Sequence, residues 1–353
     1  MPRTPQINRL VNLRKKLESE YNNRFYVDTL KIKKLKNRLT HVDLFSGAGG
    51  NIEGMRQAGF DTLLSIEIDQ DASNTIKKNF SNVNHIEGDI CNIDKFEIKK
   101  IVNRKSIDVL SAGFPCQGFS IAGFQHIDDK RNILYKQVVR MVRILNPKYV
   151  VMENVPGIIS MNDGNFVNDI RKLFARYGYP DMSILILESA SYGIAQIRPR
   201  TIFIANRLGK KNPYPKPILQ PNEFVPIESA IRDLECHNRN SKTNHEWTEH
   251  RPKMIKRLSK IKAGESLYKT YTDAAKRQYK GVPSMTIKEN HGGTHIHYKL
   301  NRMISVREMA RLQGFPDGFI FSGRMKRAMW QVGNAAPPPL FRHIGLALRS
   351  QLT

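Results

Sequence analysis

A cysteine and a glutamate stand in two short strings of the chain that could together do covalent chemistry. Cys116 lies in the string Gly-Phe-Pro-Cys-Gln-Gly-Phe-Ser at 113–120, and Glu153 opens the string Glu-Asn-Val 37 residues later. A thiolate is a nucleophile and a neighbouring carboxylic acid can supply a proton, so the pair suits attack on an electron-poor ring. Most cysteines are small buried packing residues. A Pro-Cys turn between glycines just past a strand lies at the rim of a sheet instead, so we favour the catalytic interpretation.

Both strings directly follow apolar runs, at 107–110 and 149–152, which we predict to be neighbouring parallel strands whose carboxyl ends share one crevice. The same rhythm extends over a longer region. Apolar runs at 41–45, 63–66, 107–112, 149–152, 183–187 and 201–205 alternate with helical patterns at 51–58, 70–79, 132–145 and 165–177. This alternation predicts an α/β fold with a doubly wound, mostly parallel sheet.

The flanking regions follow other patterns. Residues 6–39 are amphipathic and basic, which predicts a helical N-terminal extension over 1–39. Prolines crowd the chain after residue 207, and polar sequence continues to 301, which predicts a linker into a smaller, irregular second domain. Helical patterning returns at 305–313 and 339–352, so we assign 302–353 with 40–206 to one catalytic domain.

The net charge of +25 is unevenly distributed. Residues 1–38 carry +8, residues 207–301 carry +10 and residues 302–353 carry +6, whereas the segment 39–206 with the candidate chemistry carries only +1. Basic runs are often merely solvated faces, but three of them around a nearly neutral centre indicate an enzyme that acts on a polyanion.

Several classes of protein are disfavoured. No apolar run approaches the roughly 18–20 residues that cross a bilayer, and the charged N-terminus is unlike a signal peptide. Three distant cysteines fit neither a disulfide framework nor a zinc site, which favours the reducing cytoplasm and no bound metal. We also expect a monomer with no membrane partner. His291, His295 and His297 lack acidic or cysteine partners at ligand spacing, and we expect them to be solvated or to contact phosphate. We expect Trp247 and Trp330 to be packing residues.

A glycine-rich loop at 43–50, Asp-Leu-Phe-Ser-Gly-Ala-Gly-Gly, follows the first predicted strand and opens a helix, where the backbone can approach a ligand closely. Glu67 closes the second strand, where its carboxylate can accept bonds from ribose hydroxyls, and Asp89 follows the third strand, where it can bond an adenine amino group. An acid at a strand end is often a helix N-cap, and for Asp89 that alternative stays open. These residues indicate a nucleoside, which S-adenosylmethionine and NAD both contain.

Six strings in the chain, taken together and in order, resemble the motifs of the DNA cytosine-5 methyltransferases of bacterial restriction–modification systems. They are the loop 43–50, Pro-Cys-Gln at 115–117, Glu-Asn-Val at 153–155, Gln-Ile-Arg-Pro-Arg at 196–200, Arg-Glu-Met-Ala-Arg-Leu-Gln-Gly-Phe-Pro at 307–316 and Gln-Val-Gly-Asn-Ala at 331–335. The resemblance covers about 41–206 and 302–341, and it implies the Rossmann-like methyltransferase fold.

The resemblance also implies roles for individual residues. Cys116 would be the nucleophile, with Glu153, Arg198 and Arg200 around a target base that has left the duplex stack. Ser120 and Arg131 would lie in a loop that closes over DNA, and the variable region up to Arg302 would hold the target-recognition domain. The residues implied to contact S-adenosylmethionine are Phe45, Gly47, Gly49, Glu67, Ile68, Asp89, Pro115 and Asn334.

These residue types match the chemistry that the family implies. Cytosine C5 is a weak nucleophile, and addition of the Cys116 thiolate at C6 converts the ring to an enamine whose C5 can attack a methyl group. A protonated Glu153 would relieve charge at N3, and Arg200 would bond O2. A nearby guanidinium also favours the thiolate.

The chain departs from the family pattern at two positions. Asn132 follows Arg131 where several members have glycine, which puts the hinge of the closing loop in doubt. Ile68 follows Glu67 where some members place an aromatic residue, so the contact with adenine would be aliphatic.

Three rival interpretations remain. A relative acting on tRNA cytosine is the nearest, but the tRNA-directed members carry Cys-Phe-Thr in the variable region, whereas Cys236 here is followed by His-Asn. A DNA-binding regulator could use the basic N-terminal arm, although about 40 residues is short for such a domain. A nicotinamide reductase has no use for Cys116 with Glu153. We therefore expect double-stranded DNA as the partner, with a cognate endonuclease that would act separately.

Overall fold

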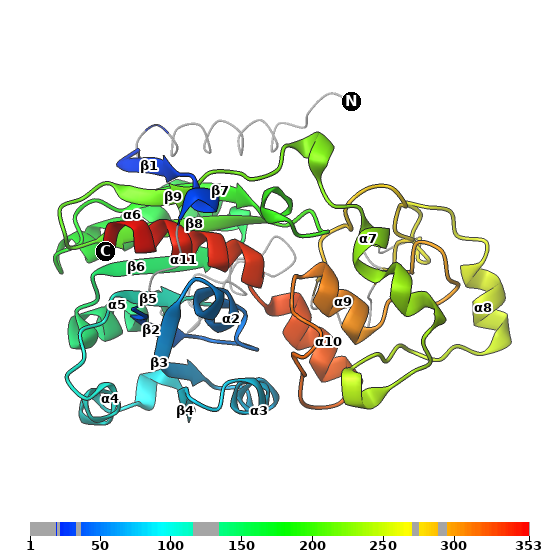
Figure 1. Ribbon diagram of the computed structural model, residues 1–353, viewed down its shortest axis with the longest axis horizontal. Coiled ribbons are helices and arrows are strands. Elements are labelled where there is room, and N and C mark those ends of the chain that lie inside the picture. Colours follow the sequence, from blue (N-terminus) through cyan, green and yellow to red (C-terminus); the bar gives the residue numbers. More distant parts are fainter. Residues whose placement is uncertain are drawn as a thin grey trace.

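The computed structural model describes residues 19, 22–32, 37–115, 134–269, 275–288 and 295–352. Within these residues a seven-stranded sheet has the order β4-β3-β2-β5-β6-β8-β7 (Figure 1). Neighbouring strands are parallel except for β8, which runs antiparallel to both β6 and β7. The strands are β2 (Leu39–Leu44), β3 (Phe60–Glu67), β4 (Asn84–Glu87), β5 (Val109–Ala112), β6 (Tyr149–Asn154), β7 (Ser183–Glu188) and β8 (Pro199–Asn206).

Helices cover both faces of this sheet. Apolar side chains of α4, α5 and α6 pack with the sheet in one core, and those of α2 and α11 pack against its other face. The helices are α2 (Gly50–Gln57), α3 (Gln70–Asn79), α4 (Lys95–Val102), α5 (Leu134–Leu145), α6 (Asn165–Ala175) and α11 (Pro338–Leu352). The prediction of a doubly wound, mostly parallel α/β sheet is confirmed.

The N-terminal region differs from the predicted helix where the structure describes it. Strand β1 (Arg24–Val27) pairs in parallel with β9 (Asn212–Pro215). The helical prediction is therefore wrong for 24–27, because the run Phe-Tyr-Val favours extended backbone and pairs with β9. The prediction of a linker is likewise wrong for β9, since Tyr214 is fully buried and donates to the carbonyls of Ser183 and Ile202, both at 3.0 Å.

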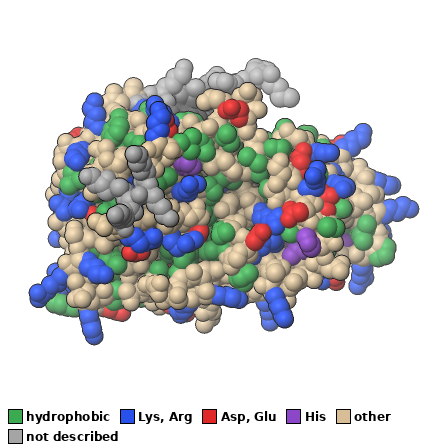
Figure 2. Space-filling view, viewed as in Figure 1, with side chains coloured by type: hydrophobic (Ala, Val, Ile, Leu, Met, Phe, Trp, Pro, Cys, Tyr) green, Lys and Arg blue, Asp and Glu red, His purple; other side chains and the backbone are tan. Residues whose placement is uncertain are grey.

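Most of the described residues between β9 and α11 form a smaller part of the molecule beside the sheet (Figure 1). Short helices and irregular loops dominate it, in agreement with its polar, proline-rich sequence. They are α7 (Ile227–Ile231), α8 (Pro252–Leu258), α9 (Val306–Leu312) and α10 (Met325–Asn334). In Figure 2 lysine and arginine side chains project from the outer edge of this part, where Figure 1 places α8.

A buried arginine holds several loops of this part together beside its apolar clusters. The guanidinium of Arg277 donates to the carbonyls of Leu258, Ile261, His297 and Leu300 at 2.7–3.1 Å.

Over the described residues, no helix combines the length and the hydropathy needed to span a bilayer.

Candidate active site

Three strand ends converge on one small space. The backbone nitrogen of Gly113, just past β5, donates to the Leu44 carbonyl at the end of β2, at 3.3 Å. A Cβ added to Gly113 would lie 3.8 Å from Glu153 Oε2 and 3.9 Å from the Phe45 carbonyl oxygen. Glu153 and Phe45 therefore face the same loop, the one that leads to Cys116, as expected for the carboxyl ends of parallel strands.

Glu153 is ion-paired in this space. Its Oε1 lies 2.7 Å from Nε of Arg200, and the two side chains are only 12% and 10% exposed. The pairing of β6 with β8 explains the contact, since the register places Glu153 opposite Ile202, two residues from Arg200. Removal of one partner from a buried ion pair typically lowers the free energy of unfolding by about 3–5 kcal/mol, because the other charge stays buried without compensation. We therefore expect each of these two residues to depend on the other.

Asn154 ties the loop that leads to Cys116 to the end of β6. Its side chain is buried, donates from Nδ2 to the Phe114 carbonyl at 3.0 Å and accepts from the Val155 backbone nitrogen at 2.9 Å. Sequence analysis assigned Asn154 no role, although its place beside Glu153 was a signal. Cys116, Ser120 and Arg131 lie outside the described residues.

The glycine loop closes on the end of β3. Phe45 and Gly47 have φ values of 54° and 51°, a left-handed conformation that is unusual for a phenylalanine. The Gly47 nitrogen donates to Glu67 Oε2 at 2.7 Å, while Ile68 and Asp69 donate to Oε1 at 2.9 and 2.8 Å. Burial raises the pKa of Glu67, and these three donors oppose the rise.

The C-terminal motif meets the same loop. A Cβ on Gly50 would lie 2.1 Å from the Ala336 carbonyl oxygen, and one on Gly54 would lie 2.5 Å from that of Pro338. Only glycines allow this approach of two backbones. The contact brings Asn334, an exposed residue at the end of α10, to the glycine loop.

Other expected cofactor residues lie around this loop. Ile68 is 66% exposed, an unusual state for a large apolar side chain, and Pro115 is half-buried. Asp89 caps a 3-10 turn by accepting from the Cys91 nitrogen at 2.9 Å, so the N-cap alternative holds for one of its oxygens. An exposed aliphatic wall, a strand-end carboxylate and an exposed amide fit an adenosyl cofactor.

Arg198 lies differently from the expectation that it surrounds the base. Its side chain is 1% exposed and donates to the carbonyls of Ile287, Gly333 and Ala335, at 2.7, 2.6 and 3.2 Å. Burial and the nearby Arg200 lower the pKa of Arg198. Both terminal nitrogens of the buried guanidinium thus bond backbone carbonyls.

A buried polar chain that sequence analysis missed underlies the glycine loop. Ser111 donates to Oδ1 of Asp43, which also accepts from Asn51 Nδ2 at 3.1 Å, and His41 Nε2 lies 2.7 Å from Ser111 Oγ. Burial raises the pKa of Asp43 to about 6, against the hydrogen bonds from Ser111 and Asn51. Burial lowers the pKa of His41 to about 3.

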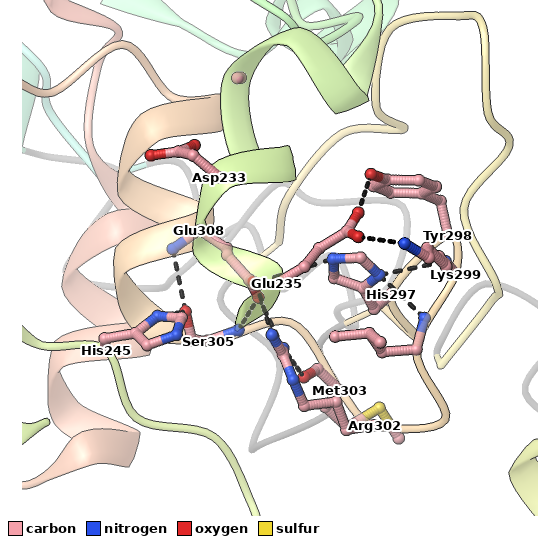
Figure 3. A network of polar contacts seen from close by, with 12 residues as sticks. Asp233, Glu235, His245, His297, Tyr298, Lys299, Arg302, Met303, Ser305 and Glu308 are labelled. Carbon is pink, nitrogen blue, oxygen red and sulfur yellow. Dashed lines mark hydrogen bonds and ion pairs between the residues drawn. The ribbon is translucent and has the colours of Figure 1, made fainter. Parts of the chain in front are cut away.

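A second polar network lies at the start of α9 (Figure 3). Glu308 is fully buried and accepts from both terminal nitrogens of Arg302, at 2.6 and 2.7 Å, and from the Ser305 nitrogen at 2.6 Å. Ser305 Oγ accepts in return from the Glu308 nitrogen, which makes a capping box. Arg302 also stacks on the ring of Trp247 at 4.2 Å, so this tryptophan packs as expected. Within the smaller part, the network joins Trp247 and Arg302 to the start of α9.

Two of the three clustered histidines are structural. His297 is fully buried, its Nδ1 accepts from the Lys299 and Leu300 nitrogens at 3.0 Å, and burial lowers its pKa to about 4. His295 is also buried and bonds the Thr286 carbonyl at 3.1 Å. The prediction of solvated or phosphate-contacting side chains is wrong for both, because both rings are buried and bond backbone groups.

Comparison with known proteins assigns this architecture to a family. The family model for C-5 cytosine-specific DNA methylases matches residues 39–350. The chain is 35% identical to Type II methyltransferase M1.HphI of Haemophilus parahaemolyticus, over 88% of this chain and 86% of that protein. It is 32% identical to Type II methyltransferase M.DdeI of Desulfomicrobium norvegicum, over 85% and 86%.

Solved structures agree. A prophage-encoded protein of Escherichia coli, assigned as a DNA modification methyltransferase, superposes with a TM-score of 0.74 at 27% identity, over 89% of this chain and 99% of that one. The methyltransferase EhMeth of Entamoeba histolytica superposes with a TM-score of 0.64 at 16% identity, over 90% and 100%, which supports the fold alone.

Proposed function

Because the chain belongs to the C-5 cytosine-specific DNA methylase family, we propose that it methylates C5 of cytosine within a short sequence of duplex DNA. It is a DNA cytosine methyltransferase by that membership. The route by base flipping, the covalent adduct and the use of S-adenosylmethionine are our proposal. The names of the Type II relatives support modification in a restriction–modification system with a separate endonuclease.

The observation that carries the proposal is the buried pair of Glu153 and Arg200 beside the loop that leads to Cys116. Addition of the Cys116 thiolate to C6 would form an S–C bond, shift the electrons of the C5–C6 double bond to C4–C5 and place the C4–N3 electron pair on N3. Glu153 would deliver a proton to N3, and Arg200 would bond O2, so that the added charge is neutralised where it appears. Once C5 carries the methyl group, loss of the C5 proton, departure of the thiolate from C6 and return of the N3 proton to Glu153 would restore the aromatic ring.

The cofactor would occupy the space between the glycine loop and the C-terminal motif. When bound, S-adenosylmethionine supplies an electrophilic methyl group on a sulfonium. Glu67 would accept the ribose hydroxyls and Ile68 would cover the adenine. The complete proposed set is Phe45, Gly47, Gly49, Glu67, Ile68, Asp89, Pro115 and Asn334.

The DNA would lie between the sheet and the smaller part, and we propose residues 207–301 as the target-recognition domain. The target base must leave the helix stack before Cys116 can reach C6. Ser120 and Arg131 would lie in the loop that closes over the DNA. The +10 charge of residues 207–301 supports a phosphate-binding role for this domain.

The decisive test traps the covalent step. A fluorine at C5 cannot leave as a proton does, so duplex DNA with 5-fluorocytosine at the target plus S-adenosylmethionine should give an adduct that survives denaturing electrophoresis. Cys116→Ala should give no adduct while retaining DNA binding, and Cys91→Ala and Cys236→Ala should keep it. Adduct formation by Cys116→Ala, or an adduct formed only with RNA, contradicts the proposal.

A further inference from the structure

Three side chains form a buried polar hub beside the segment 331–335, which we call the cofactor motif because it contains Asn334. Gln196 and Arg198 precede β8, Gln313 caps α9, and the three side chains are 0%, 1% and 0% exposed. Gln196 Nε2 donates to Gln313 Oε1 at 2.6 Å, and Arg198 lies 3.4 Å from Gln196 Oε1. The hub therefore joins two of the motifs that the sequence shares with the family.

The hub holds the backbone on both sides of Asn334. Arg198 donates to the Gly333 carbonyl at 2.6 Å and to that of Ala335 at 3.2 Å. Gln313 Nε2 donates to the same Ala335 carbonyl at 2.6 Å. The exposed side chain of Asn334 thus projects from a segment whose carbonyls are fixed from inside the protein.

The hub also holds a segment of the smaller part. Arg198 donates to the Ile287 carbonyl at 2.7 Å, and Gln196 Oε1 accepts from the Ile287 nitrogen at 2.9 Å. The backbone beside them pairs as well, because the Ile197 nitrogen donates to the Ser284 carbonyl at 2.9 Å. One guanidinium therefore bonds both the segment 284–287 and the cofactor motif.

We infer that Arg198 is a positioning residue, which sets the segment 333–335 for cofactor binding and fixes the segment 284–287 to it, without contact to the base. The inference rests on the proposed function, which supplies the cofactor. A guanidinium presents five donors in one plane, whereas an ammonium presents three around a point. A lysine at position 198 would lack the two separate terminal nitrogens with which Arg198 bonds Ile287 on one side and Gly333 and Ala335 on the other.

Arg307 provides a matched control. It is 2% exposed and, like Arg198, donates to three carbonyls: those of Thr243, Pro316 and Phe319, at 2.9, 3.2 and 2.7 Å. None of these belongs to 284–287 or 333–335. Arg307→Lys therefore carries the same loss of buried hydrogen bonds without the proposed link.

The test compares Arg198→Lys and Arg307→Lys in the full chain by amide hydrogen exchange, thermal unfolding and calorimetric binding of S-adenosylhomocysteine. Arg198→Lys should speed exchange at 284–288 and 331–337 and weaken binding by about tenfold or more, the effect of losing one to two charged hydrogen bonds. Arg307→Lys should speed exchange at 316–321 and leave the affinity within about twofold. Gln313→Ala loses its bonds to the cofactor motif and the bond from Gln196, but it keeps both hydrogen bonds to Ile287. It should therefore weaken binding with much less effect on exchange at 284–288 than Arg198→Lys.

Unchanged affinity or unchanged exchange in Arg198→Lys overturns the inference, and so does an equal loss of affinity in Arg307→Lys. Failure of the wild-type protein to bind S-adenosylhomocysteine would instead contradict the proposed function. The exchange comparison distinguishes these results, because it measures the hub without any ligand.

Discussion

Replacement of Glu153 by glutamine tests the proposed proton donor with little change of shape. In the folded protein Glu153 Oε1 lies 2.7 Å from Arg200 Nε, and an amide oxygen at that point can still accept this bond. The loss of stability should therefore fall below the roughly 3–5 kcal/mol expected when a buried charge loses its partner entirely. The amide cannot deliver a proton to N3, so formation of the adduct with 5-fluorocytosine DNA should slow by about 10²–10⁴-fold.

The assay is the single-turnover rate of adduct formation at saturating DNA and cofactor, with thermal unfolding of the same samples. A matched control is Asp108→Asn, since Asp108 Oδ1 lies 2.7 Å from Lys148 Nζ in an ion pair at the opposite end of the sheet. This control should lose stability and keep the rate. A wild-type rate in Glu153→Gln, or an equal slowing in the control, would refute the proposed role of Glu153.

Other parts of the molecule support three more predictions. Asp43→Asn removes an acid whose pKa of about 6 in the folded protein exceeds its unfolded value, so folding favours the protonated form. As pH rises from about 4 to 8, the wild type should therefore lose on the order of 3 kcal/mol of unfolding free energy relative to the variant. Chemical denaturation across this pH range measures the difference. Gly50→Ala would place a Cβ 2.1 Å from the Ala336 carbonyl and should weaken S-adenosylhomocysteine binding, whereas Gly318→Ala, with nothing within 4 Å of its Cβ, should not. Glutamine at the exposed lysines in and just after α8 should flatten the slope of log DNA affinity against log salt by about 0.9 for each phosphate that is no longer neutralised, and an unchanged slope would remove them from the interface. These lysines are Lys253, Lys256 and Lys260.

The sheet could be predicted because its strands are short, apolar and separated by helices with a period near 3.6. The same approach failed for β1 and β9. Strand β9 contains Pro213 and Pro215, which cannot donate backbone hydrogen bonds and normally argue against a strand. It forms because it pairs with β1, which lies far away in the sequence, and because Tyr214 packs into the apolar core against the main sheet. Such long-range causes leave no local pattern.

The histidines of the smaller part show a related limit. Their spacing indicated neither a metal site nor burial, and the sequence around them is polar. His297 is buried because two backbone nitrogens of the next turn need an acceptor, and its Nδ1 supplies one. Side chains that satisfy backbone groups in irregular structure follow the path of the chain, which periodicity does not predict.

The two arginines of the string 196–200 explain why a shared motif does not by itself assign a role to each residue. Both side chains are at most about a tenth exposed, and a single proline separates them. Arg200 meets the carboxylate of Glu153, so its charge is balanced at the place where charge would develop on the base. Arg198 meets three carbonyl oxygens, whose dipoles solvate its charge and whose backbones it holds in return. The first arrangement is suited to chemistry and the second to geometry, and the two could be distinguished only once the partners of each guanidinium were known.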